Sequence, residues 1–233
     1  MFDNIQAKDT KGREDTKRLS IDCKATVQIG EFSRGGKTRG ENRALDHDMG
    51  ADEKYVPFGI LDEDSGQVHL TFGASAKTSD FIVDCLQDWW EQLPESERRG
   101  LKHLQLKVDN GPESSGIRTQ FLQRMVAFAD QTGLALHLLY YPPYHSKYNP
   151  IERVWGILEL HWNGALLVDA KTMLEWAKTM TWKALHPIVK LSDTVYQKGI
   201  SLSKKAMKVV EVRLLRNPSL KKWDILILPR VLG

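Results

Sequence analysis

The sequence predicts a mixed α/β fold, in which a partly antiparallel sheet is flanked by helices. Early segments alternate apolar and polar residues, as strands do. Later segments carry apolar residues at helical spacing and alternate along the chain with further strand-like runs. The 233 residues are 41% hydrophobic and 27% charged, so they can build one sizeable core.

Strand-like segments come first. Residues 19–27 alternate apolar and polar side chains, and residues 55–61 and 67–72 form two apolar runs. The residues between these runs, 62–66, are typical of a turn, so the two runs should form a hairpin. Residues 30–50 are rich in Gly, Arg, Asp and Asn and are expected to form a long loop.

Helices and strands alternate after the hairpin. The expected elements are a helix capped by Thr78 or Ser79 and ended by Pro94, a strand over 104–108, a helix over 117–131 closed by Gly133, a strand over 134–141, and a helix that begins at Asn149 and Pro150. The ribonuclease H-like fold has this order of elements, although other folds share parts of it.

Three acidic residues lie at informative places in this order. Asp22 is on the polar face of the first strand, Asp109 ends the fourth strand, and Glu152 is in the first turn of the third helix. If the first and fourth strands are neighbours, Asp22 and Asp109 meet at a switch point of the sheet, where ligands tend to bind. Carboxylates suit Mg²⁺, and two such ions about 4 Å apart can clamp an in-line displacement at phosphorus.

Each acid also has a structural interpretation. Asp109 begins an Asp-Asn-Gly-Pro turn sequence, and Glu152 is the third helical residue after Asn149, as in a capping box. Asp22 is harder to explain in this way, because a charge within a half-apolar strand is unfavourable unless it is paired or ligated. Spacing alone leaves a metal site and structural carboxylates both open.

The composition and charge exclude several classes of protein. Cys23 and Cys85 form no CxxC pair, which excludes a disulfide framework and a cysteine-rich zinc site. No apolar run approaches the roughly 20 residues that cross a bilayer, and no secretory signal is visible.

The charged residues are unevenly distributed along the chain. Residues 187–233 hold ten basic and three acidic residues, whereas the rest of the chain holds 23 basic and 27 acidic residues. This distribution suits either a polyanion partner or a solvated terminal face.

Specific sequence motifs resemble one family. Residues 139–156 read LYYPPYHSKYNPIERVWG, and residues 107–116 read KVDNGPESSG. With IDCK at 21–24 and HDMG at 47–50, they strongly resemble the DDE domain of ISAzo-like insertion-sequence transposases, and more narrowly its short, transposase-related members. The Asn-Pro-Ile-Glu-Arg-Val-Trp run is also similar to the third-acid motif of the Tc/mariner group. The resemblance covers residues 19–230.

The resemblance implies a ribonuclease H-like fold and cutting and joining of DNA with Mg²⁺ or Mn²⁺, two ions being expected when DNA is bound. It assigns metal binding and catalysis to Asp22, Asp109 and Glu152. Water would free a 3′-hydroxyl at the element end, and that hydroxyl would attack target DNA. The implied partners are DNA, at element ends and target, and further copies of the chain; no membrane is involved. The implied location is cytoplasmic and nucleoid-associated.

The chain departs from full-length relatives, which carry an N-terminal helix-turn-helix region. We expect residues 1–18 to form a flexible polar arm, 19–186 the catalytic domain, and 187–233 a basic C-terminal extension. This departure leaves three alternatives for the chain: a truncated remnant, the partner of a separately encoded DNA-binding part, or a domesticated fragment. Two other functions are alternatives to DNA cutting and joining by a transposase. The chain is then a catalytically silent DNA-binding remnant, or a ribonuclease H-like nuclease without strand transfer.

Basic residues flank the proposed acids. Lys24, Lys147 and Arg153 are candidates for phosphate contacts, and His145 is a candidate for the wall of a DNA channel. Ordinary solvated side chains are the alternative. His145 and His161 lack the HxxxH or HExxH spacing of a zinc site. Four tryptophans lie on helical patterns and are expected in the core or at an interface: Trp89, Trp90, Trp155 and Trp162.

Overall fold

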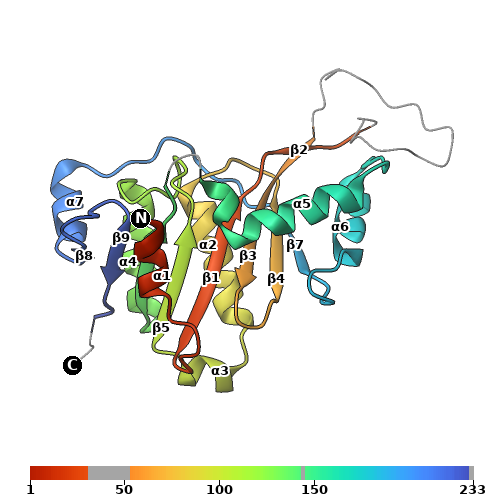
Figure 1. Cartoon of the computed structure of the whole chain (residues 1–233). Coiled ribbons are helices and arrows are strands. Elements are labelled where there is room, and N and C mark those ends of the chain that lie inside the picture. Colours follow the sequence, from red (N-terminus) through yellow and green to blue (C-terminus); the bar gives the residue numbers. More distant parts are fainter. Residues whose placement is uncertain (31–52, 143–144, 231–233) are drawn as a thin grey trace.

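The computed structural model describes residues 1–30, 53–142 and 145–230 (Figure 1). Its strands are β1 (Thr16–Cys23), β2 (Val27–Gln28), β3 (Lys54–Asp62), β4 (Val68–Gly73), β5 (His103–Val108), β6 (Ala135–Tyr140), β7 (Ile188–Ser192), β8 (Leu214–Arg216) and β9 (Asp224–Ile227). Its helices are α1 (Phe2–Lys8), α2 (Ser79–Gln92), α3 (Glu95–Gly100), α4 (Thr119–Thr132), α5 (Pro150–Trp162), α6 (Ala170–Thr179) and α7 (Lys204–Glu211), with a 3-10 turn η1 (Ser146–Tyr148).

The strands form one mixed sheet in the order β7-β4-β3-β1-β5-β6-β9-β8, and β2 pairs with β3. At its centre, β4, β3 and β1 are antiparallel neighbours, whereas β1, β5 and β6 run parallel. Three antiparallel strands followed by two parallel ones, with the first strand in the middle, is the arrangement of the ribonuclease H-like fold. The predicted fold class is therefore confirmed.

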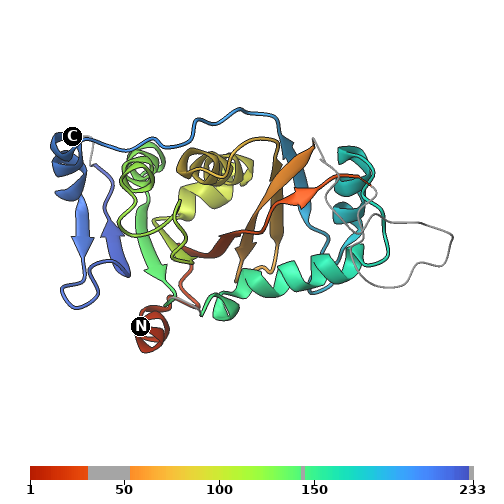
Figure 2. The ribbon, with the colours of Figure 1, turned by 90° about the horizontal axis from the view of Figure 1, so that it is seen from above.

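Helices cover both faces of the sheet (Figure 2). Leu19 and Ile21 of β1 point into a core shared with α2 and α4, which also buries Leu86 and Phe121. A second core lies between β3, β4 and the helices α5 and α6. Each fully buried side chain of this size contributes about 1.5–3 kcal/mol by leaving water, so the two cores hold the sheet from both sides.

Two predicted helix ends have the expected local chemistry. The Thr78 hydroxyl caps α2 by accepting a hydrogen bond from the Phe81 backbone N–H at 3.1 Å. Gly133 ends α4 in the left-handed conformation, at a φ of 73°, which a glycine adopts without strain. The predicted loop at 30–50 and the HDMG motif lie almost entirely outside the described residues.

The N-terminal segment differs from the flexible arm that we expected over residues 1–18. Residues 2–8 form α1, whose Ile5 packs against Leu139 and Tyr141, and β1 already begins at Thr16. Ion pairs with buried basic residues of the sheet hold the segment in place. Local hydrophobic periodicity does not report such long-range pairing, so the sequence pattern missed this order.

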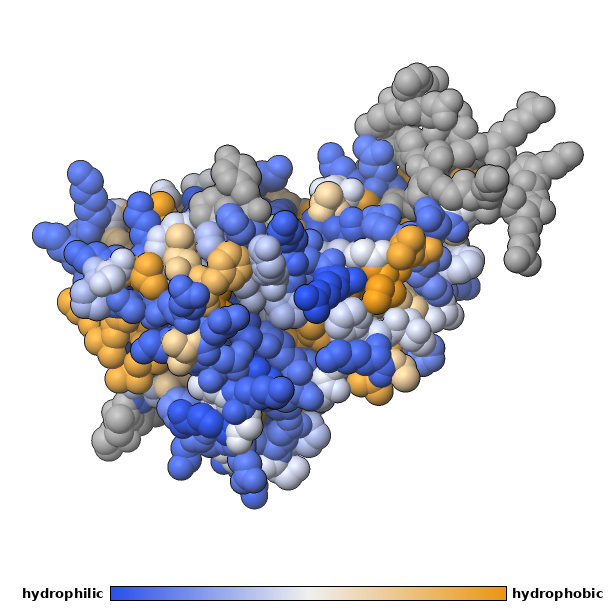
Figure 3. Space-filling model, viewed as in Figure 1, coloured by the Kyte–Doolittle hydropathy of each residue, from blue (hydrophilic) through white to orange (hydrophobic). Residues whose placement is uncertain are grey.

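The C-terminal segment differs from the extension that we expected over residues 187–233. Its first strand, β7, pairs with β4 at one edge of the sheet, and β9 pairs with β6 toward the other edge. The segment thus spans the sheet and completes it. On the face seen in Figure 3 most side chains are hydrophilic, and an apolar patch covers the β8–β9 end, where Leu215 and Leu228 are exposed. No helix in the described part is long and apolar enough to cross a membrane.

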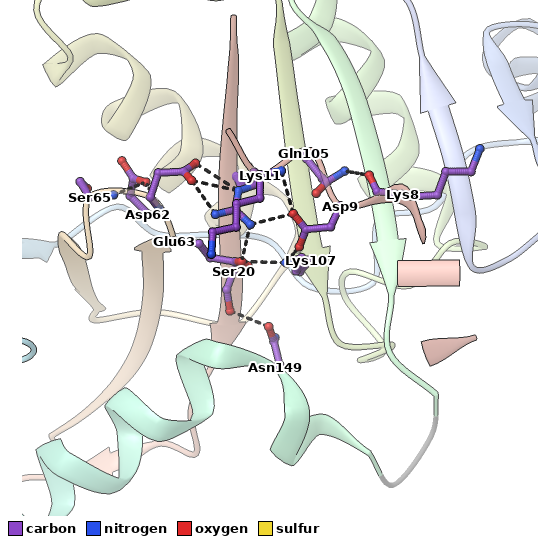
Figure 4. A network of polar contacts seen from close by, with 12 residues as sticks. Lys8, Asp9, Lys11, Ser20, Asp62, Glu63, Ser65, Gln105, Lys107 and Asn149 are labelled. Atoms are coloured by element: carbon purple, nitrogen blue, oxygen red, sulfur yellow. Dashed lines mark hydrogen bonds and ion pairs between the residues drawn. The ribbon is translucent and has the colours of Figure 1, made fainter. Parts of the chain in front are cut away.

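A network of charged side chains joins the N-terminal segment to the sheet (Figure 4). The Lys107 ammonium, on β5, lies 2.7 Å from the carboxylates of both Asp9 and Glu63. The Arg18 guanidinium, on β1, lies 2.7 Å from Asp9. Lys107 is only 5% exposed, so its charge depends on these partners rather than on water.

Replacement of Lys107 tests this network. Lys107→Met removes one of the two cations beside Asp9 and Glu63 and leaves only Arg18, so we expect the free energy of unfolding to fall by about 3 kcal/mol. Urea denaturation at neutral pH measures it. Lys178→Met is the matched control, because it breaks an exposed ion pair with Glu175, and it should cost less than about 1 kcal/mol. Equal effects of the two substitutions would contradict a structural role for the network.

Candidate active site

Asp22 and Asp109 reach the same place because β1 and β5 run parallel. Ile21 and Val108 are register partners, and each acid is the next residue along its strand or just past its end. Both acids line one small pocket, together with Lys77 and Ser114. The structure therefore brings two of the three predicted acids to one pocket at the carboxyl ends of neighbouring strands.

The pocket disfavours negative charge on Asp22. This side chain is only 8% exposed, and its burial, followed by the charges of Asp109 and Glu152, raises its pKa from 3.8 to about 7. The Lys77 ammonium and a hydrogen bond from the Trp155 indole N–H to Oδ2, at 3.0 Å, act in the opposite direction. Asp22 is therefore a carboxylate that its surroundings only partly compensate.

Asp109 has a similar but more polar setting. Burial raises its pKa, while the Lys77 charge, the Gly111 backbone N–H and the Ser114 hydroxyl lower it. The Ser114 hydroxyl lies 3.5 Å from Oδ1 of Asp109. These donors are those of a tight turn, so the structural interpretation of Asp109 describes part of its environment. That interpretation does not account for the shared pocket with Asp22.

Glu152 lies near this pair without joining its pocket. It occupies the first turn of α5 and is half-buried, and its charge contributes to the raised pKa of Asp22. It does not line the pocket that Asp22 and Asp109 share. Across residues 1–30, 53–142 and 145–230, no group of three or more His, Cys, Asp or Glu side chains has an arrangement that could hold a metal ion.

The start of α5 is fixed to β1 by Ser20 and Asn149. The Ser20 hydroxyl donates to Oδ1 of Asn149 at 2.5 Å and accepts from the Ile151 backbone N–H at 2.9 Å. The Asn149 amide donates to the Ile21 carbonyl at 3.1 Å. The Asn149 side chain therefore binds the neighbouring strand rather than capping its own helix. Sequence analysis missed this contact, although Ser20 shares the polar face of Asp22.

A glycine allows α5 to approach Asp22 closely. Gly59 of β3 is the register partner of Asp22, and a Cβ there would lie 2.8 Å from the Trp155 ring and 3.0 Å from Ile151. Trp155 is buried, as its helical pattern predicts. Its indole N–H serves Asp22 as well, a role that the pattern gave no sign of.

Lys77 is the other site residue that sequence reasoning missed. It immediately precedes α2, and its ammonium donates to the Cys23 carbonyl at 3.4 Å. Its charge lowers the pKa of both Asp22 and Asp109. The family motifs that mark the acids leave Lys77 out, so only the fold shows that it belongs to the pocket.

The predicted phosphate-binding residues have different surroundings. Lys24 forms an ion pair with Glu159 at 2.6 Å, so its charge is already compensated. Arg153 is exposed on α5, and Lys147 is exposed with its ammonium 5.2 Å from the Tyr148 ring centre. His145 is also exposed and stacks on Tyr148, with 6.0 Å between ring centres.

The Asp22 and Asp109 pair fits a hard divalent cation. Mg²⁺ prefers oxygen ligands and is usually held by one or two carboxylates, with waters and substrate phosphates completing its shell. Burial raises the pKa of both acids, so a cation bound beside them would favour their charged forms. The oxygen donors of Asp22 and Asp109 are therefore of the kind that such a cation takes.

Substitution of Asp22 should stabilise the protein at neutral and alkaline pH. The folded pKa of about 7 exceeds the unfolded value near 3.8, so the folded state holds more protons between these limits and loses stability as pH rises through them. Asp22→Asn removes the buried charge and keeps an oxygen for Trp155. We expect a gain of about 2–4 kcal/mol in unfolding free energy at about pH 8.

Urea denaturation in EDTA at about pH 4 and about pH 8 measures this effect. The two proteins should differ by less than about 1 kcal/mol at the lower pH, because Asp22 is protonated in the folded state and close to half protonated in the unfolded state, where its pKa is near 3.8. Asp88→Asn on the exposed face of α2 is the control. A variant that is destabilised by the same amount at both pH values would show that Asp22 has no raised pKa.

Two solved structures have low similarity to this chain, with sequence identities of 12% and 17%. In solved structures, the HTLV-2 integrase catalytic core domain in complex with magnesium matches 74% of this chain and 92% of its own, at 12% identity and a TM-score of 0.34. The simian T-cell lymphotropic virus intasome in complex with the PP2A subunit B56 gamma matches 82% of this chain and 62% of its own, at 17% identity and a TM-score of 0.37. No curated protein sequence matches.

The family comparison covers almost the whole chain. A family model described as the Rhodopirellula transposase DDE domain matches residues 1–229. This match includes α1 and β1, the pocket of Asp22 and Asp109, and the strands of the C-terminal segment. The resemblance that the sequence motifs indicate is therefore confirmed, and the chain belongs to this family of transposase DDE domains.

Proposed function

We propose that this chain catalyses divalent-metal-dependent DNA strand cleavage and strand transfer at the ends of an insertion sequence. One observation carries the proposal: Asp22 and Asp109, from neighbouring parallel strands, line one pocket, where burial raises the pKa of both. Membership of the transposase DDE-domain family supports the same reaction. Catalysis and metal binding are assigned to Asp22, Asp109 and Glu152.

Each site residue has a part in positioning. Divalent ions, Mg²⁺ or Mn²⁺, would activate the attacking oxygen and stabilise the leaving oxygen when bound at these carboxylates. The Trp155 N–H orients the Asp22 carboxylate, and the Ser114 hydroxyl contacts that of Asp109. Ser20 and Asn149 tie the start of α5 to β1 and so hold the helical turn of Glu152 near Asp22, whose pKa the Glu152 charge raises.

DNA is the proposed partner, both as element ends and as target. Arg153 and Lys147 are exposed in and just before the helix that carries Glu152, so phosphates near the pocket lie within reach of this basic pair. Lys24 can serve in the same way if Glu159 releases it. Assembly of several copies on DNA, with or without a separately encoded DNA-binding part, belongs to the same proposal.

The activity test uses the purified chain, Mg²⁺ or Mn²⁺, and labelled duplex DNA that carries candidate element ends. Wild type should nick the DNA and join the new 3′ end to a target. Asp109→Asn should reduce both steps by at least about 100-fold, because it removes one of the two carboxylates of the pocket. Asp88→Asn, an exposed acid outside the site, should retain activity. Wild-type binding without cleavage would favour the silent remnant, and cleavage without joining would favour the nuclease.

Metal binding can be measured without DNA. Mg²⁺ at ten times its dissociation constant should stabilise the folded wild type by about 1.4 kcal/mol, because it binds the folded site and not the unfolded chain. Thermal unfolding with increasing Mg²⁺ reports this shift. Asp109→Asn should lose most of it, whereas Asp88→Asn should keep it. An equal shift in all three proteins would place the bound cation elsewhere.

A further inference from the structure

A polar groove of about 700 Å³ adjoins the candidate active site. Its walls come from β2, the start of β3, the turn between β4 and α2, and the segment around Lys198. Lys77 lines both this groove and the pocket of Asp22 and Asp109. A ligand in the groove would therefore lie beside the two carboxylates.

Lysines outnumber carboxylates among the residues that line the groove. Lys54, Lys77 and Lys198 line it from three separate segments of the chain. Within the described ranges none of the three forms an ion pair, unlike Lys107, which contacts Asp9 and Glu63. One carboxylate lines the groove, that of Glu113, and the Arg118 guanidinium lies 3.4 Å from it. The groove thus suits an anion.

The neutral lining identifies the kind of anion. Thr26 and Ser75 contribute hydroxyl groups, which can donate to phosphate oxygens. The Ser75 hydroxyl accepts from the Tyr196 backbone N–H at 3.0 Å and retains its own proton to donate. No aromatic side chain is among the described residues that line the groove, so it offers no stacking platform for bases. This lining fits a sugar–phosphate backbone.

The position of α2 adds to the attraction. This 14-residue helix begins at Ser79, directly after the groove residues Lys77 and Thr78, so the positive end of its dipole lies at the groove. The lysines, the hydroxyl groups and the helix end together form an extended surface rather than a single-ion site. Its breadth and open shape match a chain of phosphates.

We propose that this groove holds the phosphodiester backbone of one DNA strand where that strand leaves or enters the catalytic pocket, with Lys77 at the junction. This inference rests on the proposed function. Because the contacts reach phosphates and not base edges, binding here should be insensitive to sequence and sensitive to salt. The groove is separate from the basic side chains at the start of α5.

Charge reversal at the two exposed lysines tests the groove. Lys54→Glu/Lys198→Glu should weaken DNA binding by at least about 10-fold and reduce the slope of log affinity against log salt by about 2, since about 0.9 is lost per phosphate contact. Fluorescence anisotropy over a range of KCl concentrations, with two unrelated duplex sequences, measures both. The loss should be the same for each sequence, and inorganic phosphate at equal ionic strength should not displace the DNA.

The matched control is Lys102→Glu/Lys171→Glu, which changes the net charge equally. Lys102 is exposed at the other end of β5 from Asp109, and Lys171 is exposed on α6. This control should lose much less affinity and slope than the groove variant. Both double variants should keep the wild-type Mg²⁺ shift, which shows that the fold and the carboxylate pocket are intact.

Two failures are distinguishable. Equal DNA affinity and salt slope in the groove and control variants would overturn the groove assignment. The proposed function would still stand if the wild type cleaved and joined DNA. Displacement by inorganic phosphate alone would also overturn it, because the groove would then bind a single anion. A wild type that binds DNA but never cleaves or joins it would overturn the proposed function, and a weaker groove variant would still support the groove.

Discussion

The central constraint in this protein is the confinement of two carboxylates in one poorly solvated pocket. The parallel pairing of β1 and β5 places Asp22 and Asp109 at adjacent strand ends, and burial then makes their charges unfavourable. A fold selected for stability alone would place neutral side chains there. The contacts of Trp155 with Asp22, of Ser114 with Asp109 and of Ser20 with Asn149 hold the surrounding elements in this arrangement.

One face of β1 shows how the constraint is met along a single strand. Arg18, Ser20 and Asp22 alternate with the buried Leu19 and Ile21, and each polar residue contacts a segment far away in the sequence or at the start of the chain. Arg18 binds the segment after α1, Ser20 binds the start of α5, and Asp22 receives the indole N–H from α5. The opposite face packs into the core beneath α2 and α4. Stability and the candidate chemistry are therefore divided between the two faces of one strand.

The lysines of this protein differ in whether they have a carboxylate partner within the fold. The buried Lys107 lies at hydrogen-bonding distance from carboxylates. Lys24, which follows β1, forms an ion pair with Glu159 of α5. The lysines of the groove beside the pocket have no such partners in the described structure. The groove lysines, which form no ion pair in the described structure, therefore lie next to Asp22 and Asp109. Positive charge at this position would attract a polyanionic substrate.

Sequence alone determined the local elements and the candidate acids. Alternation and helical spacing identified the hairpin and the helices α2, α4 and α5, because these patterns record which side of each element is buried. The motifs around Asp109 and Glu152 identified the family, which the match over residues 1–229 confirms. The roles of the acids stay predictions until metal binding and cleavage are measured.

Only the tertiary structure decided which distant residues meet. It paired the polar N-terminal segment with Lys107 and Arg18, and it placed the C-terminal strands at both edges of the sheet. It brought Lys77 into the carboxylate pocket and the Trp155 N–H to Asp22, it tied Ser20 to the start of α5, and it left Glu152 outside that pocket. These contacts join residues far apart in the chain, and a local pattern reports burial but not the identity of the partner. The physical reason is that strand order, and not periodicity, determines which side chains become neighbours.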